Sequence, residues 1–341
     1  MVPITGRLPV RPTFAVLFAL LLLGALLGLR TGPMPLTTAD VWQGLFATDA
    51  EATVQLVVRE LRLPRLLLAM LVGAALAVAG ALLQGLFRNP LADPGLIGIS
   101  SGAALGAVSV IVLGERLFAR WDMAVPGLAL PLAAFACALL TTAVIWRIGN
   151  RQGVTHVAML LLAGIAINAI AMAGVGVLTF VADDGQLRTL TFWTMGSLAQ
   201  ADWQDLRLVA PWILLVLLAM PVLARALNAV LLGESVAMHL GHDVDRLKRR
   251  IVVMCALAVG AAVSVSGLIG FVGLVAPHLV RLTLGVDHRM LLPASALLGA
   301  VLLVLADTAA RLIVAPAEFP IGLMMALIGG PFFLALLMRR F

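Results

Sequence analysis

The chain has 341 residues, of which 62% are hydrophobic and only 12% are charged. Soluble globular domains contain about 25% charged residues, so this composition excludes a soluble enzyme and favours a multi-pass membrane protein in contact with lipid. The net charge is +6, but the basic residues stand at the ends of apolar segments rather than in one patch, which argues against a nucleic-acid partner.

Apolar runs of membrane length follow one another through the first half of the chain. A helix needs about 20 apolar residues to cross the hydrocarbon core. By this criterion the first five spans are expected at residues 14–29, 63–86, 95–113, 125–146 and 155–181. The connector between the first two spans is polar, and Thr38–Phe46 within it begins like a capped amphipathic helix that should lie at the membrane interface.

The uncharged run 251–280 is the least ordinary segment of the second half. As a single helix it would be about 45 Å long, which is too long for one crossing. Basic residues flank both of its ends, so the positive-inside rule places both ends in the cytoplasm and requires two spans. We therefore expect a tight hairpin of two helices, with its turn and bends at the glycines between residues 267 and 273.

The remaining spans complete the predicted topology. They are expected at residues 206–223, 292–312 and 321–338, and a short periplasmic helix is expected at about 185–198. Together these segments predict an all-α polytopic membrane protein with ten transmembrane helices in a single domain, residues 1–341, and with cytoplasmic N and C termini.

Segment 225–250 is the one long stretch that is both amphipathic and heavily basic at one end. Gly233 interrupts its apolar stripe, Gly241 offers a helix stop and Asp243 offers a new N-cap. We expect two short cytoplasmic helices within about 227–245. A short surface helix with an apolar face usually lies against a partner, and the alternative is a solvated connector.

The sequence contains no catalytic motif that would make the chain an enzyme. A phosphate-binding lysine loop, a zinc-protease motif and a nucleophile elbow are all missing. Cys137 and Cys255 lie inside apolar runs, and a surface role is favoured over metal binding for His239 and His242, so no metal site is expected. Nearly all spans lack the charges that ion-coupled carriers use, so a transporter would need an external energy source.

Two polar side chains inside the spans have competing interpretations. Asp307 is the one intramembrane acid, and pairing with Arg311 one turn further on is favoured over an ion relay. Asn168 lies near the middle of the fifth span, where an amide needs a polar partner or a water-filled cavity. Packing against another helix and lining of a pore remain equally open for it.

Three stretches carry a resemblance to a known family. They are RNPLADPGLIGISSGAALG at 88–106, LLGESVAMHLG at 231–241 and GLIGFVGLVAPHLVRL at 267–282. In this order and spacing they resemble the permease subunits of FecCD-type ABC importers for iron-siderophores, haem and cobalamin. The resemblance implies a type II ABC importer permease fold and a homodimer in the cell inner membrane. It also implies two cytoplasmic ATPase subunits, which bind ATP and Mg²⁺, and one periplasmic binding protein, with no cofactor on this chain.

The resemblance also implies roles for particular residues. The ATPase-coupling segment corresponds to Leu231, Leu232, Gly233, Glu234, Ser235, Val236, Ala237, Met238, Leu240 and Gly241. The arginines that dock the binding protein correspond to Arg62, Arg65 and Arg311, although Arg62 and Arg65 could instead anchor a helix end at the headgroups. The pore and its cytoplasmic gate correspond to Asn150, Thr155, Met159, Asn168 and Met172.

The resemblance also suggests which substrate the permease carries. Segment 182–199 is similar to haem importers, so haem is favoured, followed by a ferric siderophore and then cobalamin. The pore offers no committed axial ligand for haem iron, so the binding protein would supply most of the recognition. The rivals from other classes are an ion-coupled secondary carrier and an intramembrane enzyme.

Overall fold

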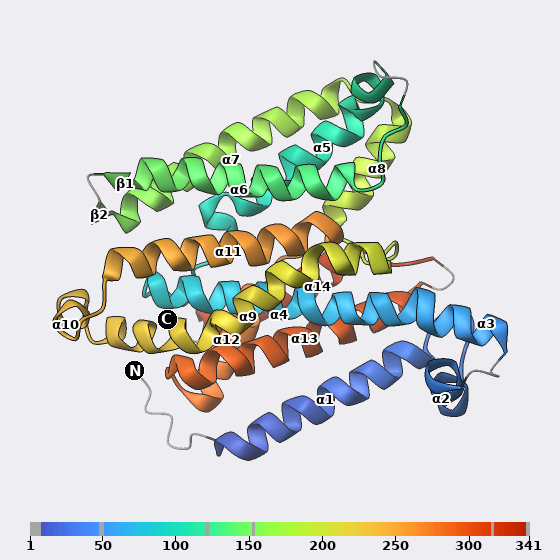
Figure 1. Cartoon of the computed structure of the whole chain (residues 1–341), viewed down its shortest axis with the longest axis horizontal. Coiled ribbons are helices and arrows are strands. Elements are labelled where there is room, and N and C mark those ends of the chain that lie inside the picture. Colours follow the sequence, from blue (N-terminus) through green and yellow to red (C-terminus); the bar gives the residue numbers. More distant parts are fainter. Residues whose placement is uncertain (1–7, 48–50, 120–122, 152–153, 315–316, 339–341) are drawn as a thin grey trace.

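A computed structural model describes residues 8–47, 51–119, 123–151, 154–314 and 317–338 as a bundle of long helices (Figure 1). The helices are α1 Val10–Arg30, α2 Thr38–Phe46, α3 Ala52–Gln55, the π-helix η1 Leu56–Arg62, α4 Leu63–Leu86, the 3₁₀-helix η2 Pro94–Ile97, α5 Ile99–Phe118, α6 Ala129–Gly149, α7 Val157–Phe180, α8 Asp184–Met195, α9 Trp203–Leu231, α10 Glu234–His239, α11 Val244–Ser266, α12 Val272–Leu284, α13 His288–Ile313 and α14 Ile321–Met338. Strands β1 Asn150–Arg151 and β2 Val154–Thr155 form one antiparallel ribbon.

Within the described residues, eight helices are long and apolar enough to cross a membrane. They are α1, the continuous helix Ala52–Leu86 that contains α4, α5, α6, α7, α9, α11 and α13. Two shorter apolar helices, α12 and α14, follow the same alternating path through the bundle (Figure 1). The 13 residues of α12 span only about 20 Å, so ten full crossings remain a prediction. The C-terminal residues 339–341 lie outside the described part.

Helix α4 is the centre of the bundle. It packs against α13, α11, α12 and α9, and 83% of its most apolar window is buried inside the protein. Glycines allow this close approach, because a Cβ atom on Gly80 would overlap the backbone of Gly273 in α12 and one on Gly73 would overlap Gly299 in α13. Helices α5, α6 and α7 form a second group that meets the centre through α11 (Figure 1).

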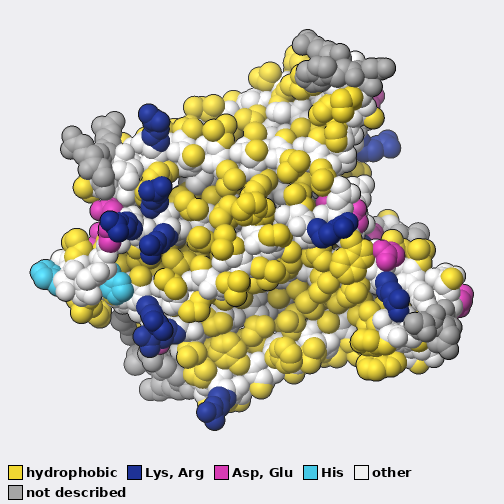
Figure 2. All heavy atoms as spheres, in the orientation of Figure 1, with side chains coloured by type: hydrophobic (Ala, Val, Ile, Leu, Met, Phe, Trp, Pro, Cys, Tyr) yellow, Lys and Arg dark blue, Asp and Glu magenta, His cyan; other side chains and the backbone are white. Residues whose placement is uncertain are grey.

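The outer surface divides into an apolar middle and two charged ends. The face in Figure 2 has a broad band of hydrophobic side chains, and its Lys, Arg, Asp and Glu side chains lie mostly toward the ends. Helix α10 and the β1–β2 ribbon lie at the same end (Figure 1). We call this end the α10 end; the opposite end holds α2 and α8. This division matches a bilayer-spanning domain.

Two sequence expectations about local helices are confirmed. Helix α2 covers Thr38–Phe46, and Thr37 and Asp40 cap its start by exchanging hydrogen bonds between side chains and backbone N–H groups. The short helix expected at 185–198 is α8, which Asp183 and Gln186 cap in the same reciprocal way. Both capping patterns are local, so they can be recognised from the sequence.

The predicted hairpin over 251–280 is only partly correct. The break falls where glycines were expected, since α11 ends at Ser266, α12 begins at Val272, and both Gly267 and Phe271 have positive φ angles of 66°. The two helices do not form a tight hairpin, however. In the described structure α11 packs against α4, α6 and α9, whereas α12 packs against α13, α4 and α14. Helix α4 contacts both of them, which the sequence of the segment alone cannot indicate.

The expectation of two short helices within 227–245 is only partly correct. Helix α9 continues without interruption to Leu231, so only α10 is a separate short helix. Gly233 lies between α9 and α10 and has a φ angle of 123°, and Gly241 lies between α10 and α11 and has a φ angle of 84°. Both conformations favour glycine. The apolar stripe before Gly233 is therefore the end of a helix of 29 residues, which at about 1.5 Å per residue is longer than the roughly 30 Å hydrocarbon core.

Candidate functional site

Helix α10 and the leucines that flank it, Leu231, Leu232 and Leu240, present an apolar surface at one end of the molecule, which we call the apolar face of α10. Leu232 is 67% exposed, Met238 57% and Leu240 60%, whereas Ala237 is fully buried against the bundle. Leu231 and Val236 are exposed as well. Leucine and methionine side chains on a short exposed helix form a surface suited to a protein partner.

Lys248 connects α10 to the rest of this end. Its ammonium group donates to Glu234 Oε2 at 2.9 Å and to the backbone oxygen of Thr155 at 3.4 Å. Lys248 is only 6% exposed, and it lies in the second turn of α11. One turn earlier, Asp245 Oδ1 accepts the backbone N–H of Thr155 at 2.9 Å. The start of α11 therefore holds α10 on one side and the β1–β2 ribbon on the other.

The predicted gate residues fall into two groups. Asn150 and Thr155 face each other in the ribbon register, and the Asn150 amide lies 3.5 Å from Thr155 Oγ1. Thr155 is buried, Met159 is half-buried and Met172 is 52% exposed on α7. The structure thus brings Asn150 and Thr155 together at the α10 end and places Met172 farther along the helix that follows. Their role as a gate stays a prediction.

Asn168 makes its hydrogen bonds inside the chain. Its Nδ2 donates to the backbone oxygen of Gly95 at 2.9 Å, and its Oδ1 accepts the hydroxyl of Ser101. These bonds join α7 to η2 and to the first turn of α5. Of the two interpretations left open above, packing between helices therefore has direct structural support.

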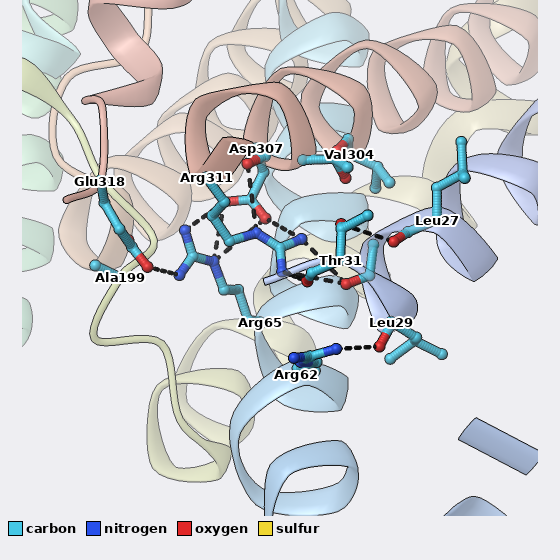
Figure 3. A network of polar contacts seen from close by, with 12 residues as sticks. Leu27, Leu29, Thr31, Arg62, Arg65, Ala199, Val304, Asp307, Arg311 and Glu318 are labelled. Carbon is cyan, nitrogen blue, oxygen red and sulfur yellow. Dashed lines mark hydrogen bonds and ion pairs between the residues drawn. The ribbon is translucent and has the colours of Figure 1, made fainter. Parts of the chain in front are cut away.

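A buried ionic network occupies the opposite end of the bundle (Figure 3). Arg65 Nη2 lies 2.8 Å from Asp307 Oδ1, and its Nη1 lies 2.8 Å from Glu318 Oε1. Asp307 also pairs with Arg311 at 3.2 Å, which confirms the pairing expected from their spacing of one helical turn. Asp307 is 2% exposed, so one buried carboxylate faces two guanidinium groups.

Backbone oxygens complete the coordination of the arginines. Arg311 Nη1 donates to Gly28 and Thr31 at 3.1 and 2.9 Å, at the end of α1. Arg62 donates to the oxygens of Leu29 and Met34. Charge-assisted bonds of this kind are stronger than neutral ones, so the network ties α1, α4 and α13 together.

The three arginines expected to dock a partner therefore point inward. Arg62, Arg65 and Arg311 are 7%, 8% and 8% exposed, and each has bonded partners within the chain. Contact with an acidic partner surface would require them to leave those partners. Docking stays a prediction, and the structure assigns these residues a role in holding the helix ends together.

Sequence reasoning missed three charged residues of these sites. In the sequence, Lys248 is one of a run of basic residues, Asp245 follows the N-cap Asp243 by two positions, and Glu318 lies in the connection to α14. Lys248 stands between the apolar residues Leu247 and Ile251 in the sequence. This position on an apolar helix face is a signal that its side chain is buried, and both neighbours are buried in the structure, at 5% and 0% exposed. Glu318 has no comparable local signal.

The histidines do not form a metal site in the described part of the chain. Groups of three or more His, Cys, Asp or Glu side chains able to hold an ion are not found among those residues. The His239 ring Nδ1 contacts the Ser235 oxygen at 2.7 Å. This local contact agrees with the surface role expected for His239.

Comparison with known proteins gives a consistent group of relatives. The chain matches the FecCD transport family over residues 20–339. It is 46% identical to the hemin transport system permease protein HmuU of Yersinia pestis, with 98% of each chain covered. It is 43% identical to the cobalamin import system permease protein BtuC of Halobacterium salinarum, covering 84% of this chain and 75% of that protein.

A further relative and a solved structure extend this result. Identity to the Fe(3+)-citrate import system permease protein YfmE of Bacillus subtilis is 36%, with 98% and 97% of the two chains covered. A structure of an inward-facing conformation of a transporter assigned to the metal-chelate ABC type superimposes with a TM-score of 0.83 at 32% identity, covering 96% of this chain and 99% of that one.

Proposed function

The chain belongs to the FecCD transport family, and on that premise we propose that it carries haem across the cell inner membrane as one half of a homodimeric permease. As the permease of an ABC importer it is not itself catalytic. Two partner ATPases on the cytoplasmic face bind ATP and Mg²⁺ and supply the energy. One periplasmic binding protein delivers the cargo to the opposite face.

The apolar face of α10 is the observation that carries this proposal. It projects from the end of the bundle at which α11 begins with the basic residues Arg246, Lys248, Arg249 and Arg250, so the positive-inside rule places it in the cytoplasm. Leu232, Met238 and Leu240 are exposed close to one another in the sequence, and a cluster of exposed apolar side chains marks a surface for a partner. A cytoplasmic ATPase is the partner that an ABC permease requires.

The homodimer is supported by two further apolar faces. On α7, Leu162, Ile165, Ile170 and Val177 are each at least 60% exposed, and on α14 Leu327 is 66% exposed. A second copy placed against α7 and α14 would enclose a pathway walled by leucine, isoleucine, valine and methionine. Such a wall holds a cargo weakly and favours its release.

Haem is favoured over the other cargoes of the family. The relative named for hemin transport is 46% identical over 98% of the chain, whereas the cobalamin and Fe(3+)-citrate relatives are 43% and 36% identical. A ferric chelate and cobalamin are therefore the alternatives.

Uptake by proteoliposomes tests the proposal. The chain is reconstituted with its cognate ATPase and binding protein, and uptake of haem, ferric citrate and cobalamin is measured in parallel. We expect ATP-dependent uptake of haem above the other two. Preferred uptake of another cargo would reassign the substrate and leave the class unchanged. Uptake without the ATPase that an ionophore abolishes would instead support an ion-coupled carrier.

A further inference from the structure

The start of α11 contacts two elements that are far apart in the sequence, α10 and the β1–β2 ribbon. On one side Lys248 pairs with Glu234, the first residue of α10. On the other side Lys248 and Asp245 hold the two backbone polar groups of Thr155, its oxygen at 3.4 Å and its N–H at 2.9 Å. Thr155 precedes the first residue of α7 by two positions.

These contacts differ from ordinary surface ion pairs. Lys248 is 6% exposed and Thr155 is 3% exposed, so both groups would lose hydrogen bonds that water could not easily replace. The neighbouring pair Arg246–Asp243 has side chains that are 78% and 50% exposed, and solvent screens it. The Lys248 contacts join α10, α11 and β2, and two of the three groups, Lys248 and Thr155, are buried, whereas the Glu234 side chain is 44% exposed.

We propose that Lys248 and Asp245 are positioning residues that transmit movement of α10 to the β1–β2 ribbon and the start of α7. The inference rests on the proposed function, in which a partner ATPase moves α10. When α10 shifts, the Glu234 carboxylate draws Lys248 with it, and the bond from Lys248 to the Thr155 oxygen changes. Asp245 stays bonded to the Thr155 N–H, so the ribbon moves together with α11.

The test compares Lys248→Met with Lys248→Arg in the complex with the ATPase and binding protein. The methionine variant keeps the length of the side chain and removes its charge and donors, whereas the arginine variant keeps them. The double variant Asp243→Asn with Arg246→Gln removes the exposed pair of the same helix turn and is the matched control. Haem uptake per ATP hydrolysed and hydrogen exchange of the peptide containing Thr155 are measured with and without ATP.

We expect Lys248→Met to retain ATP hydrolysis and to lower uptake per ATP by about 2- to 30-fold, the range typical of residues that couple distant sites. Exchange of the Thr155 N–H, which stays bonded to Asp245, should no longer respond to ATP in this variant, while Lys248→Arg and the control behave as the wild type. Wild-type uptake and an unchanged ATP response in Lys248→Met would overturn the inference and leave the proposed function intact. Failure of the wild-type complex to transport would count against the proposed function, while the exchange response of Thr155 would still decide the linkage.

A second feature, independent of the first, lies on the outer surface between α9 and α13. A cavity of about 530 Å³ opens there, and its walls are Leu217, Met220, Pro221, Ala224, Arg225, His288, Arg289 and Pro293. In the described part of the chain, Arg225 and Arg289 form no salt bridge. The carboxylate of Asp287 beside them is already bonded to Asn228 and to the Arg289 backbone.

The residues around this cavity indicate which kind of ligand it could bind. It lies next to exposed Leu214, Leu218 and Val222 on α9, which form part of the apolar surface, and its two arginines lie toward the α10 end. Apolar walls beneath a pair of basic side chains match an acyl chain beneath a phosphate group. We infer that the cavity binds an anionic phospholipid of the cytoplasmic leaflet.

Native mass spectrometry of the purified chain with added cardiolipin or phosphatidylcholine tests this site. The variant Arg225→Gln with Arg289→Gln is compared with the charge-matched control Arg246→Gln with Arg249→Gln. We expect selective cardiolipin binding that the first variant weakens by about 25-fold, since each arginine near an anionic surface contributes about fivefold.

Two results from the comparison of lipids and variants would overturn the lipid site, and a third, from competition with phosphate, would do so as well. One is equal binding of both lipids, or of cardiolipin by both variants. The other is loss of ATPase assembly in the first variant with unchanged lipid binding, which would assign the arginines to the protein partner. Inorganic phosphate at the same concentration should not compete, because the apolar walls require an acyl chain; full competition would reduce the site to a phosphate site and contradict the inference.

Discussion

Arg65 and Asp307 are 242 residues apart in the sequence, yet their side chains meet in a forked ion pair, with Arg65 Nη2 and Nε 2.8 and 3.0 Å from the same carboxylate oxygen. The pair joins the central helix α4 to α13. Because Asp307 also faces Arg311, it is the buried counter-charge of two cations.

Removal of this counter-charge should destabilise the fold. In Asp307→Asn, two buried guanidinium groups lose their carboxylate, and breaking a buried pair costs about 3–5 kcal/mol. The midpoint of thermal unfolding in detergent should fall accordingly. Glu318→Gln is the control, because Glu318 is 33% exposed, so solvent partly screens its pair with Arg65 and its removal should cost less than that of Asp307. Equal losses in both variants would contradict the central role of Asp307.

Gly80→Ala should separate α4 from α12. The added methyl group would overlap the carbonyl of Gly273, and overpacking of this kind costs about 1–3 kcal/mol or more. Gly114→Ala in α5 is the matched control, since its methyl group would meet Val110 and Val125 at an ordinary 3.5 Å. We expect the control to unfold at or slightly above the wild-type midpoint, as alanine favours helix.

Asn168→Ala should lower stability by about 0.6–1.7 kcal/mol, the range for hydrogen bonds between membrane helices. The variant loses the bonds to Gly95 and Ser101. Met172→Ala on the same helix should leave the unfolding midpoint unchanged, because Met172 is 52% exposed. A wild-type midpoint for Asn168→Ala combined with altered haem uptake would favour pore lining over packing.

Charge on the apolar face of α10 should block assembly with the ATPase. Leu232→Asp and Met238→Asp should each weaken the interface by about 2 kcal/mol or more if they replace central contacts. Both side chains are more than half exposed, so the isolated chain should unfold as before. Co-purification of the ATPase measures assembly. Leu312→Asp, an exposed position at the opposite end, is the control and should assemble normally.

Asp287 should make a small contribution to stability that depends on pH. It caps α13, and the Arg289 backbone N–H, together with the Asn228 amide, holds the pKa of its carboxyl below the ordinary value. A lowered pKa in the folded chain stabilises it above the unfolded pKa of about 3.9, and this stability is lost as pH falls through the folded pKa. Asp287→Asn should flatten that acid-side decline in the unfolding midpoint; an unchanged pH profile would assign the decline to other carboxyls.

The sequence alone determined the features that depend on neighbouring residues. Runs of apolar residues located the long apolar helices, the capping pattern at the start of Thr38–Phe46 predicted α2, and the glycines after Ser266 located the break between α11 and α12. The spacing of Asp307 and Arg311 identified their pairing. Each of these depends on a few consecutive bonds or one helical turn, so local chemistry is sufficient.

Only the tertiary structure decided which distant groups meet. Glu318 beside Arg65, Lys248 beside Thr155 and Gly80 against Gly273 are contacts between helices whose order around α4 is set by packing of the whole bundle. The same packing turned the arginines expected at the surface inward and kept α9 helical up to Leu231. A basic or small residue has the same sequence signature whether it lies at a surface or in a helix interface, because its burial depends on which helix packs beside it.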